Sequence, residues 1–131
     1  MKYKYPIGLG FAVLFVGVFV SGFLDWAFLV PHIDKLYHFV GGIALGWFFY
    51  IYFSFETVSF SKFKKIIIVV SATCFVAVLW EYAERLSTIY SPEHARWLYH
   101  WFKGGDLTDT LLDILAGITG GLAFALLGID K

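Results

Sequence analysis

The sequence predicts an all-α integral membrane protein, with four transmembrane helices in a bundle and a short interfacial amphipathic helix between the third and the fourth. Composition is the first reason. The 131 residues are 60% hydrophobic and 21% aromatic, whereas soluble proteins are about 45–50% apolar. The second reason is that the apolar residues form runs of about 20, the length that crosses roughly 30 Å of hydrocarbon.

Four runs have this length, and the predicted spans cover residues 7–24, 36–55, 63–82 and 110–129. The first run carries no charge, and the second contains His38 as its one group that titrates near neutral pH. The third ends with Glu81, and the fourth is interrupted by Asp113. No internal repeat, linker or low-complexity tract separates these runs. We therefore expect a single transmembrane domain over residues 1–131.

The first predicted span has an alternative interpretation as a cleaved signal peptide. Lys2 and Lys4 form a basic start, and small residues follow the apolar run at Ser21 and Gly22. The apolar run is longer than the 7–15 residues or so that are usual in signal peptides. We expect a retained helix.

The basic residues predict the orientation in the membrane. With four spans, both termini lie on the same side as the loop between the second and third spans. That side carries six basic residues: Lys2, Lys4, Lys62, Lys64, Lys65 and Lys131. The other side carries four: Lys35, Arg85, Arg96 and Lys103. Because short loops rich in Lys and Arg stay in the cytoplasm, we expect both termini there.

The stretch before the fourth span predicts the interfacial helix, over about residues 92–103. Ser91 is a typical N-cap, Pro92 suits the first helical position, and Gly104 suits a helix end. Aromatic residues gather inside it, as is typical of helices at the headgroup level: Trp97, Tyr99, Trp101 and Phe102.

Charge and cysteine content exclude several kinds of function. The formal net charge is zero, so a nucleic-acid partner has no electrostatic support. The single cysteine, Cys74, excludes an intramolecular disulfide and a cysteine-based zinc site.

Polar residues gather where three predicted helices meet the outer side of the membrane. Each helix end carries a stripe of residues spaced by three or four, which is one helical face. The stripes are Asp34, His38, Gly42 and Gly46; Cys74, Ala77, Glu81 and Arg85; and Asp106, Asp109, Asp113, Gly117 and Gly120. Small residues let membrane helices approach closely, so we expect the stripes to face one another. His38, Glu81 and Asp113 would then converge about one turn below the surface.

This convergence predicts a divalent metal site. His38, Asp109 and Asp113 are the expected ligands, and Mg²⁺, Mn²⁺, Ca²⁺ or Zn²⁺ would suit such oxygen and imidazole donors. A bound metal lowers the pKa of its water, and Glu81 is the expected general base. The corresponding reaction is metal-assisted hydrolysis or transfer at a phosphate ester.

The expected ligand is a lipid or an envelope-precursor headgroup. Lys35, Arg85 and Lys103 would bind its anionic group, while Asp34 and Asp106 complete the pocket. Membrane lipids are therefore the expected partners, and the small-residue helix faces would also allow a homo-oligomer or a membrane partner protein.

Each polar residue also has a structural interpretation. Asp106 and Asp109 would stabilise the start of the fourth helix by capping and through its dipole. Asp113 would form an ion pair with Arg85, Lys35 or Lys103. Glu81 would pair with Arg85, His38 would bond to Asp34, and Glu84 is assigned no special role. Together these contacts would form an ionic network that locks three helices.

Three stretches resemble the YjdF-like family of small bacterial inner-membrane proteins. They are "DKLYHFVGGIALG", "WEYAER" and "GDLTDTLLDILAGITGG", which match an H-F-x-x-G stretch, an acidic helix end and a G-D-x-x-D-T-x-x-D block. The resemblance implies a multi-pass protein of the bacterial cell (inner) membrane. It places motif positions at Asp34, His38, Glu81, Asp106, Asp109, Thr110 and Asp113.

A broader resemblance is to VanZ-like proteins, which are associated with resistance to glycopeptide antibiotics such as teicoplanin. They carry a similar D-K-x-x-H-F opening. This sequence departs from their pattern at Glu84, where they have Gln, and at Gly117, where they have Asn. The resemblance implies a second function, that of a non-catalytic envelope or antibiotic-tolerance factor with a structural ion-pair network.

Overall fold

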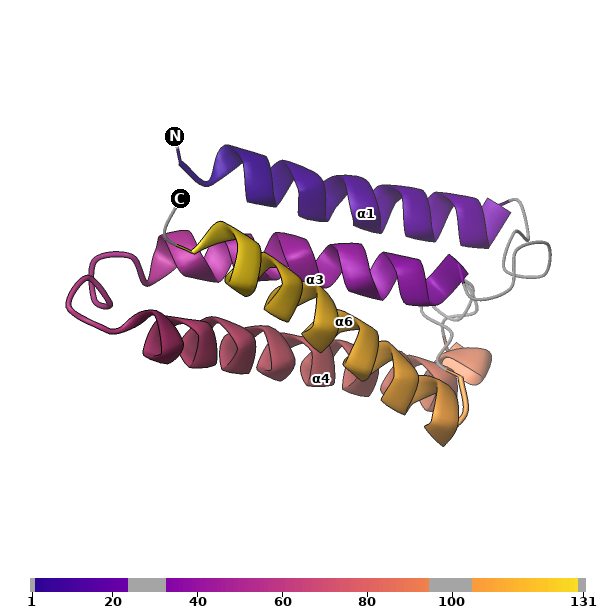
Figure 1. Cartoon of the computed structure of the whole chain (residues 1–131). Helices are drawn as coiled ribbons and strands as arrows, with labels where there is room; N and C mark the ends of the chain where they lie inside the picture. Colours follow the sequence, from indigo (N-terminus) through magenta and orange to yellow (C-terminus); the bar gives the residue numbers. More distant parts are fainter. Residues whose placement is uncertain (1, 24–32, 95–104, 130–131) are drawn as a thin grey trace.

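The structure is a computed structural model that describes residues 2–23, 33–94 and 105–129. Four helices account for most of these residues: α1 (Lys4–Phe23), α3 (Ile33–Tyr52), α4 (Lys62–His94) and α6 (Leu107–Gly128) (Figure 1). The described part of the chain contains no strand, which confirms the all-α prediction.

Two of the four helices are long and apolar enough to cross a membrane by length and composition. They are the Lys62–Tyr90 part of α4 and the whole of α6. In α1 the apolar helix over Lys4–Gly17 is shorter than a span. The described part of α3 does not qualify, since it begins with Asp34 and Lys35 and ends in polar-tipped aromatic residues.

The third predicted span ended too early. Helix α4 continues without a break from Lys62 to His94, over 33 residues, so Ser91 does not begin a separate helix. The apolar run stops near Tyr82, but the next residues, such as Ala83 and Glu84, are good helix formers. A change from apolar to polar composition therefore does not end this helix. Apart from residues 92–94, the predicted interfacial helix lies outside the described residues.

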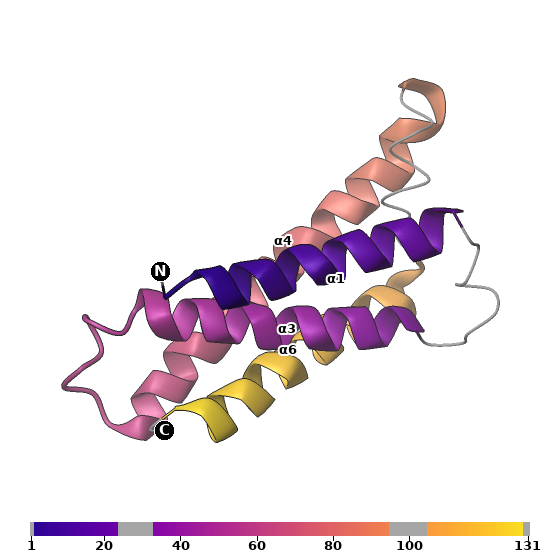
Figure 2. The same cartoon turned by 90° about the horizontal axis from the view of Figure 1, so that it is seen from above.

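The helices form a bundle in which α3 and α6 run side by side in the same direction (Figures 1 and 2). Helix α4 packs against both in the opposite direction, and its last turns diverge from α3 and α6 (Figure 2). Helix α1 packs on α3, antiparallel to it, with Tyr5 stacked on Trp47 at a ring separation of 6.2 Å. The starts of α3 and α6 and the second half of α4 thus share one end of the bundle, here called the polar end.

Glycines bring α3 and α6 into backbone contact. Each helix carries a G-x-x-x-G pair, Gly42 with Gly46 and Gly117 with Gly121. A Cβ atom on Gly42 would overlap the carbonyl of Gly117, and a Cβ atom on Gly46 would lie 3.2 Å from the Cα of Gly121. Side chains are thus excluded from this contact, which is the usual role of such pairs between membrane helices.

Helix α4 presents its own stripe to these glycines. Val69, Thr73, Ala77 and Glu81 follow one another at intervals of four and are 2%, 0%, 9% and 4% exposed. A Cβ on Gly117 would lie 3.4 Å from the Cβ of Ala77. The stripe confirms the expected Ala77–Glu81 face, except that Thr73 occupies the buried position and Cys74 is half-buried.

The three helices therefore stack in four layers, each with one residue from α3, α4 and α6. From the polar end these are His38, Glu81 and Asp113; Gly42, Ala77 and Gly117; Gly46, Thr73 and Gly121; and Tyr50, Val69 and Ala125. The glycine layers set the helix spacing, and the first layer is polar because the same stripes continue toward the end of the bundle.

We predict opposite effects for two alanine substitutions. Gly42→Ala places a methyl group against the Gly117 carbonyl and should lower the free energy of unfolding by about 3 kcal/mol. Gly8→Ala on α1 has open space around its Cβ and should raise it by about 1 kcal/mol, because alanine favours helix. Thermal unfolding in detergent, followed by circular dichroism, measures both. Equal effects of the two changes would contradict the proposed glycine contact.

Candidate functional site

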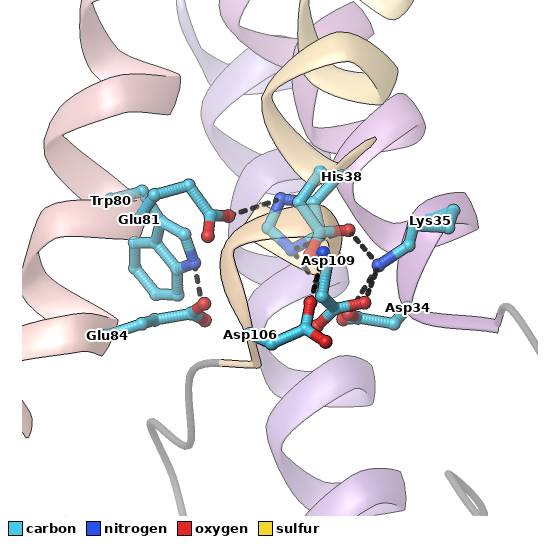
Figure 3. Close-up of polar contacts among 9 residues, drawn as sticks. Asp34, Lys35, His38, Trp80, Glu81, Glu84, Asp106 and Asp109 are labelled. Atoms are coloured by element: carbon cyan, nitrogen blue, oxygen red, sulfur yellow. Dashed lines mark hydrogen bonds and ion pairs between the residues drawn. The ribbon is translucent and has the colours of Figure 1, made fainter. Parts of the chain in front are cut away.

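The polar end holds a group of seven charged or titratable side chains, which we call the polar centre (Figure 3). Helix α3 contributes three from its first two turns, α6 contributes two, and α4 contributes two from its midpoint onward. They are Asp34, Lys35, His38, Asp109, Asp113, Glu81 and Glu84. The expected convergence of His38, Glu81 and Asp113 is therefore confirmed.

Asp106 lies beside the polar centre and acts as a helix cap. It is the N-cap of α6, with extended backbone, and its side chain accepts a hydrogen bond of 2.9 Å from the Asp109 amide. This contact satisfies one of the free amide groups at the helix start. The capping interpretation of Asp106 is confirmed.

Lys35 is the main cation of the polar centre. Its Nζ lies 2.5 Å from Asp109 Oδ1, 2.6 Å from Asp113 Oδ1 and 3.5 Å from Asp34 Oδ2. Lys35 lies in the first turn of α3, before the apolar stretch. Its partial burial disfavours the charged ammonium. Contacts with Asp109 and Asp113 outweigh the burial and raise the pKa of Lys35 above its ordinary value. Of the cations considered for Asp113 that lie in the described residues, Lys35 contacts it and Arg85 does not.

His38 lies between three carboxylates, one each from α3, α4 and α6. Its Nε2 is 3.6 Å from Asp34 Oδ1 and 3.8 Å from Asp113 Oδ1, while its Nδ1 is 3.5 Å from Glu81 Oε1 (Figure 3). The imidazole, followed by Lys35, holds the pKa of Asp34 below its usual value. The two ring nitrogens thus face different acidic groups.

Glu81 is more deeply buried than Glu84, the other α4 acid of the polar centre. The residue is 4% exposed, and its Oε1 makes no hydrogen bond. Thr110 of α6 lies near the same carboxylate, which gives this motif residue a place at the site. A buried carboxylate oxygen without a donor is costly, so it requires a proton or a cation nearby.

Glu84 belongs to the site although sequence reasoning assigned it no role. It is half-buried, and Trp80 Nε1 donates a hydrogen bond of 2.7 Å to its Oε1 (Figure 3). The signal that would have found it is the i, i+3 spacing of Glu81 and Glu84, which puts both on one helical face.

Two overlapping groups of possible metal donors share His38. One is Asp34, His38 and Asp113, and the other is His38, Glu81 and Glu84, with the donor atoms of each within 4.8 Å of one another. Asp109, which was an expected ligand, lies in neither group and instead contacts Lys35.

The negative charge of the polar centre exceeds its positive charge in the described part of the chain. Five carboxylates (Asp34, Glu81, Glu84, Asp109 and Asp113) gather around Lys35 and His38. Lys35 contacts the three aspartates and neither glutamate. The excess charge is thus greatest on the α4 side.

The other two residues predicted to bind the headgroup are Arg85 and Lys103. Arg85 is exposed on α4, one turn beyond Glu81, and within the described residues no ion pair joins the two. Lys103 lies outside the described residues.

Removal of the Lys35 charge should destabilise the protein, because the buried Asp113 loses its counterion. We predict that Lys35→Met lowers the free energy of unfolding by about 3–5 kcal/mol in metal-free buffer, because Asp113 is left buried and unpaired. Lys62→Met, at an exposed lysine at the other end of the bundle, is the control and should change it by less than about 1 kcal/mol. Chemical denaturation in detergent measures both, and a double variant with Asp113→Asn should recover part of the loss.

Comparisons with known proteins agree with the membrane assignment. No match was found among curated proteins or solved structures. A family model described as "Predicted membrane protein (DUF2238)" matches residues 8–130, a range that includes every member of the polar centre. This description names neither the YjdF-like nor the VanZ-like family, so those resemblances stay predictions. Since the model covers nearly the whole chain, the chain belongs to the DUF2238 family of membrane proteins.

Proposed function

We propose that the polar centre binds a divalent cation through His38 Nδ1, Glu81 and Glu84. The observation that carries this proposal is the buried Glu81 carboxylate, whose Oε1 has no hydrogen bond and lies 3.5 Å from His38 Nδ1. Glu84 lies beside it, so two carboxylates and one imidazole nitrogen surround a common point. A cation there would offset charge that burial makes costly.

Charge compensation favours this group of donors over the alternative one. Lys35 lies against Asp34 and Asp113, so that group already holds a cation. In the glutamate group, the hydrogen bond from Trp80 to Glu84 is a neutral contact and leaves the charge in place. A divalent ion therefore gains more Coulomb energy on the glutamate side.

Two carboxylates and one imidazole suit Mn²⁺ or Zn²⁺, and Mg²⁺ with more bound water. Three protein donors leave coordination positions for water and a ligand, and the ion would polarise a phosphate ester oxygen and activate a water. In this proposal Glu81 is a ligand, which replaces its expected role as a free general base.

The proposed ligand of the cation is an anionic lipid or envelope-precursor headgroup. Two features support this. Arg85 is exposed one turn beyond Glu81 on the same face of α4, where it would add a second positive group. The chain also belongs to a membrane protein family, which brings lipid headgroups to the polar end.

We further propose that all four helices cross the membrane, with the polar end outward. Helix α3 has 20 residues and lies along α6, which has 22, so both would cover about 30 Å of the same membrane. Lys62, Lys64 and Lys65 lie at the opposite end, where the positive-inside rule favours the cytoplasm.

The competing function is that of a non-catalytic envelope factor whose polar centre only locks the helices. The bridge that Lys35 makes between α3 and α6 favours it. This alternative predicts protein that contains no divalent ion when purified without chelator. It also predicts that apolar replacement of Glu81 and Glu84 leaves stability unchanged or raised.

The cation proposal predicts saturable binding of about one Mn²⁺ per chain, measured by electron paramagnetic resonance of the purified protein in detergent. Glu84→Gln removes one ligand and should weaken binding by about 100-fold. Glu56→Gln is the matched control, because Glu56 is exposed at the other end of the bundle and should leave the affinity unchanged. Equal affinities of the two variants would refute the assignment.

The headgroup proposal predicts lipid binding that depends on the cation. In native mass spectrometry, phosphatidylglycerol should remain bound in Mn²⁺ more than in EDTA, and phosphatidylcholine should show no such difference. Arg85→Gln should weaken the phosphatidylglycerol complex by about fivefold, as expected for one exposed charge contact of about 1 kcal/mol. Retention that is independent of Mn²⁺ would leave the cation without a role in headgroup binding.

A further inference from the structure

We infer that Lys35 is a tethered cation that occupies a second cation position, formed by Asp34, His38 Nε2 and Asp113, and thereby directs a divalent ion to the glutamate side of His38. This inference rests on the proposed cation site and adds how the chain selects between two sets of donors. It predicts that removal of the Lys35 charge creates a binding position that does not need Glu84.

The position of Lys35 carries the first step. Its Nζ lies 2.6 Å from Asp113 Oδ1 and 3.5 Å from Asp34 Oδ2. Those two carboxylates, with His38, form one of the two groups whose donor atoms lie within 4.8 Å. The ammonium thus lies against two of the three donors that would hold an ion there, and a second cation would be repelled.

The burial of Asp113 carries the second step. The residue is 2% exposed, and the Lys35 ammonium, 2.6 Å from its Oδ1, is the cation that compensates it. A buried carboxylate oxygen without a hydrogen-bond donor is a good ligand for a metal once the lysine charge is gone. Asp34, at the more open edge of the group, would supply the second carboxylate.

The chemistry of the imidazole carries the third step. A neutral histidine has one protonated nitrogen and one free lone pair, so it binds one ion through one nitrogen at a time. An ion on Nδ1 leaves the Nε2 proton directed toward Asp34 and Asp113, at 3.6 and 3.8 Å. An ion on Nε2 leaves the Nδ1 proton directed toward Glu81, at 3.5 Å. Each arrangement therefore has an acidic partner for the remaining N–H, which is the usual support of a metal-bound histidine.

The test compares Mn²⁺ affinity in four forms of the full chain: the unaltered protein, Glu84→Gln, Glu84→Gln with Lys35→Met, and Glu84→Gln with Lys35→Arg. Glu84→Gln alone should lose about 100-fold in affinity. Adding Lys35→Met should recover most of this loss, to within about tenfold of the unaltered protein, because the second position opens. Adding Lys35→Arg keeps the charge and should recover nothing.

A third change locates the recovered ion. Asp34→Asn should abolish Mn²⁺ binding in the Glu84→Gln, Lys35→Met background, where it removes a ligand. In the unaltered protein it should weaken binding by at most about tenfold, because Asp113 remains as an acidic partner of the Nε2 proton. Should Lys35→Met fail to fold, Asp109→Asn is added, since it removes one excess charge and Asp109 belongs to neither donor group. The same comparison is then made in that background.

The outcomes separate the two proposals. If Lys35→Met restores nothing to Glu84→Gln, the inference is overturned while the proposed cation site stands. If the unaltered protein binds no Mn²⁺, the proposed site fails. In that case, gain of Mn²⁺ binding by Lys35→Met alone would still support the role of Lys35 as a tethered cation, and no gain would overturn it.

Discussion

The backbone contact between Gly42 and Gly117 fixes the relative position of α3 and α6, and the rest of the bundle follows from it. Because no side chain fits between these two residues, the helices cannot slide past one another without separating. One turn toward the polar end, the same register sets His38 opposite Asp113. Packing of small residues therefore decides which polar groups meet, although the glycines themselves have no chemistry.

Burial of the polar layer lowers the stability of the bundle, and the packing of the layers beneath it can offset that loss. Glu81 and Asp113 are almost fully buried, and Lys35 contacts Asp113 but not Glu81. A protein optimised for stability alone would place apolar residues there. The close packing of Ala77, Thr73 and the glycines below holds the helices together despite this cost. Such an arrangement is typical of a site maintained for function.

Much of the site could be predicted from the sequence, because residues at intervals of four lie on one face of a helix however the helices pack. The stripes of α3 and α6 and the convergence of His38, Glu81 and Asp113 are confirmed. The extent of α4 could not be predicted, since polar residues that leave the membrane are still good helix formers. The choice of Lys35 as the partner of Asp113 also depends on side-chain reach between helices, which spacing within one helix does not contain. Glu84 was missed for the opposite reason, because its spacing from Glu81 was visible but its burial was not.

The parallel course of α3 and α6 has an electrostatic consequence. Peptide dipoles place about half a positive charge at the N-terminus of a helix, and both of these helices begin at the polar end. Asp34 lies in the first turn of α3 and Asp109 in the first turn of α6, so the backbone itself attracts these two carboxylates. Helix α4, which runs the opposite way, offers its glutamates no such field. The helix N-termini of α3 and α6 thus add to the attraction that Lys35 exerts on these two aspartates, whereas within the described residues the α4 glutamates of the polar centre contact neither Lys35 nor a helix N-terminus.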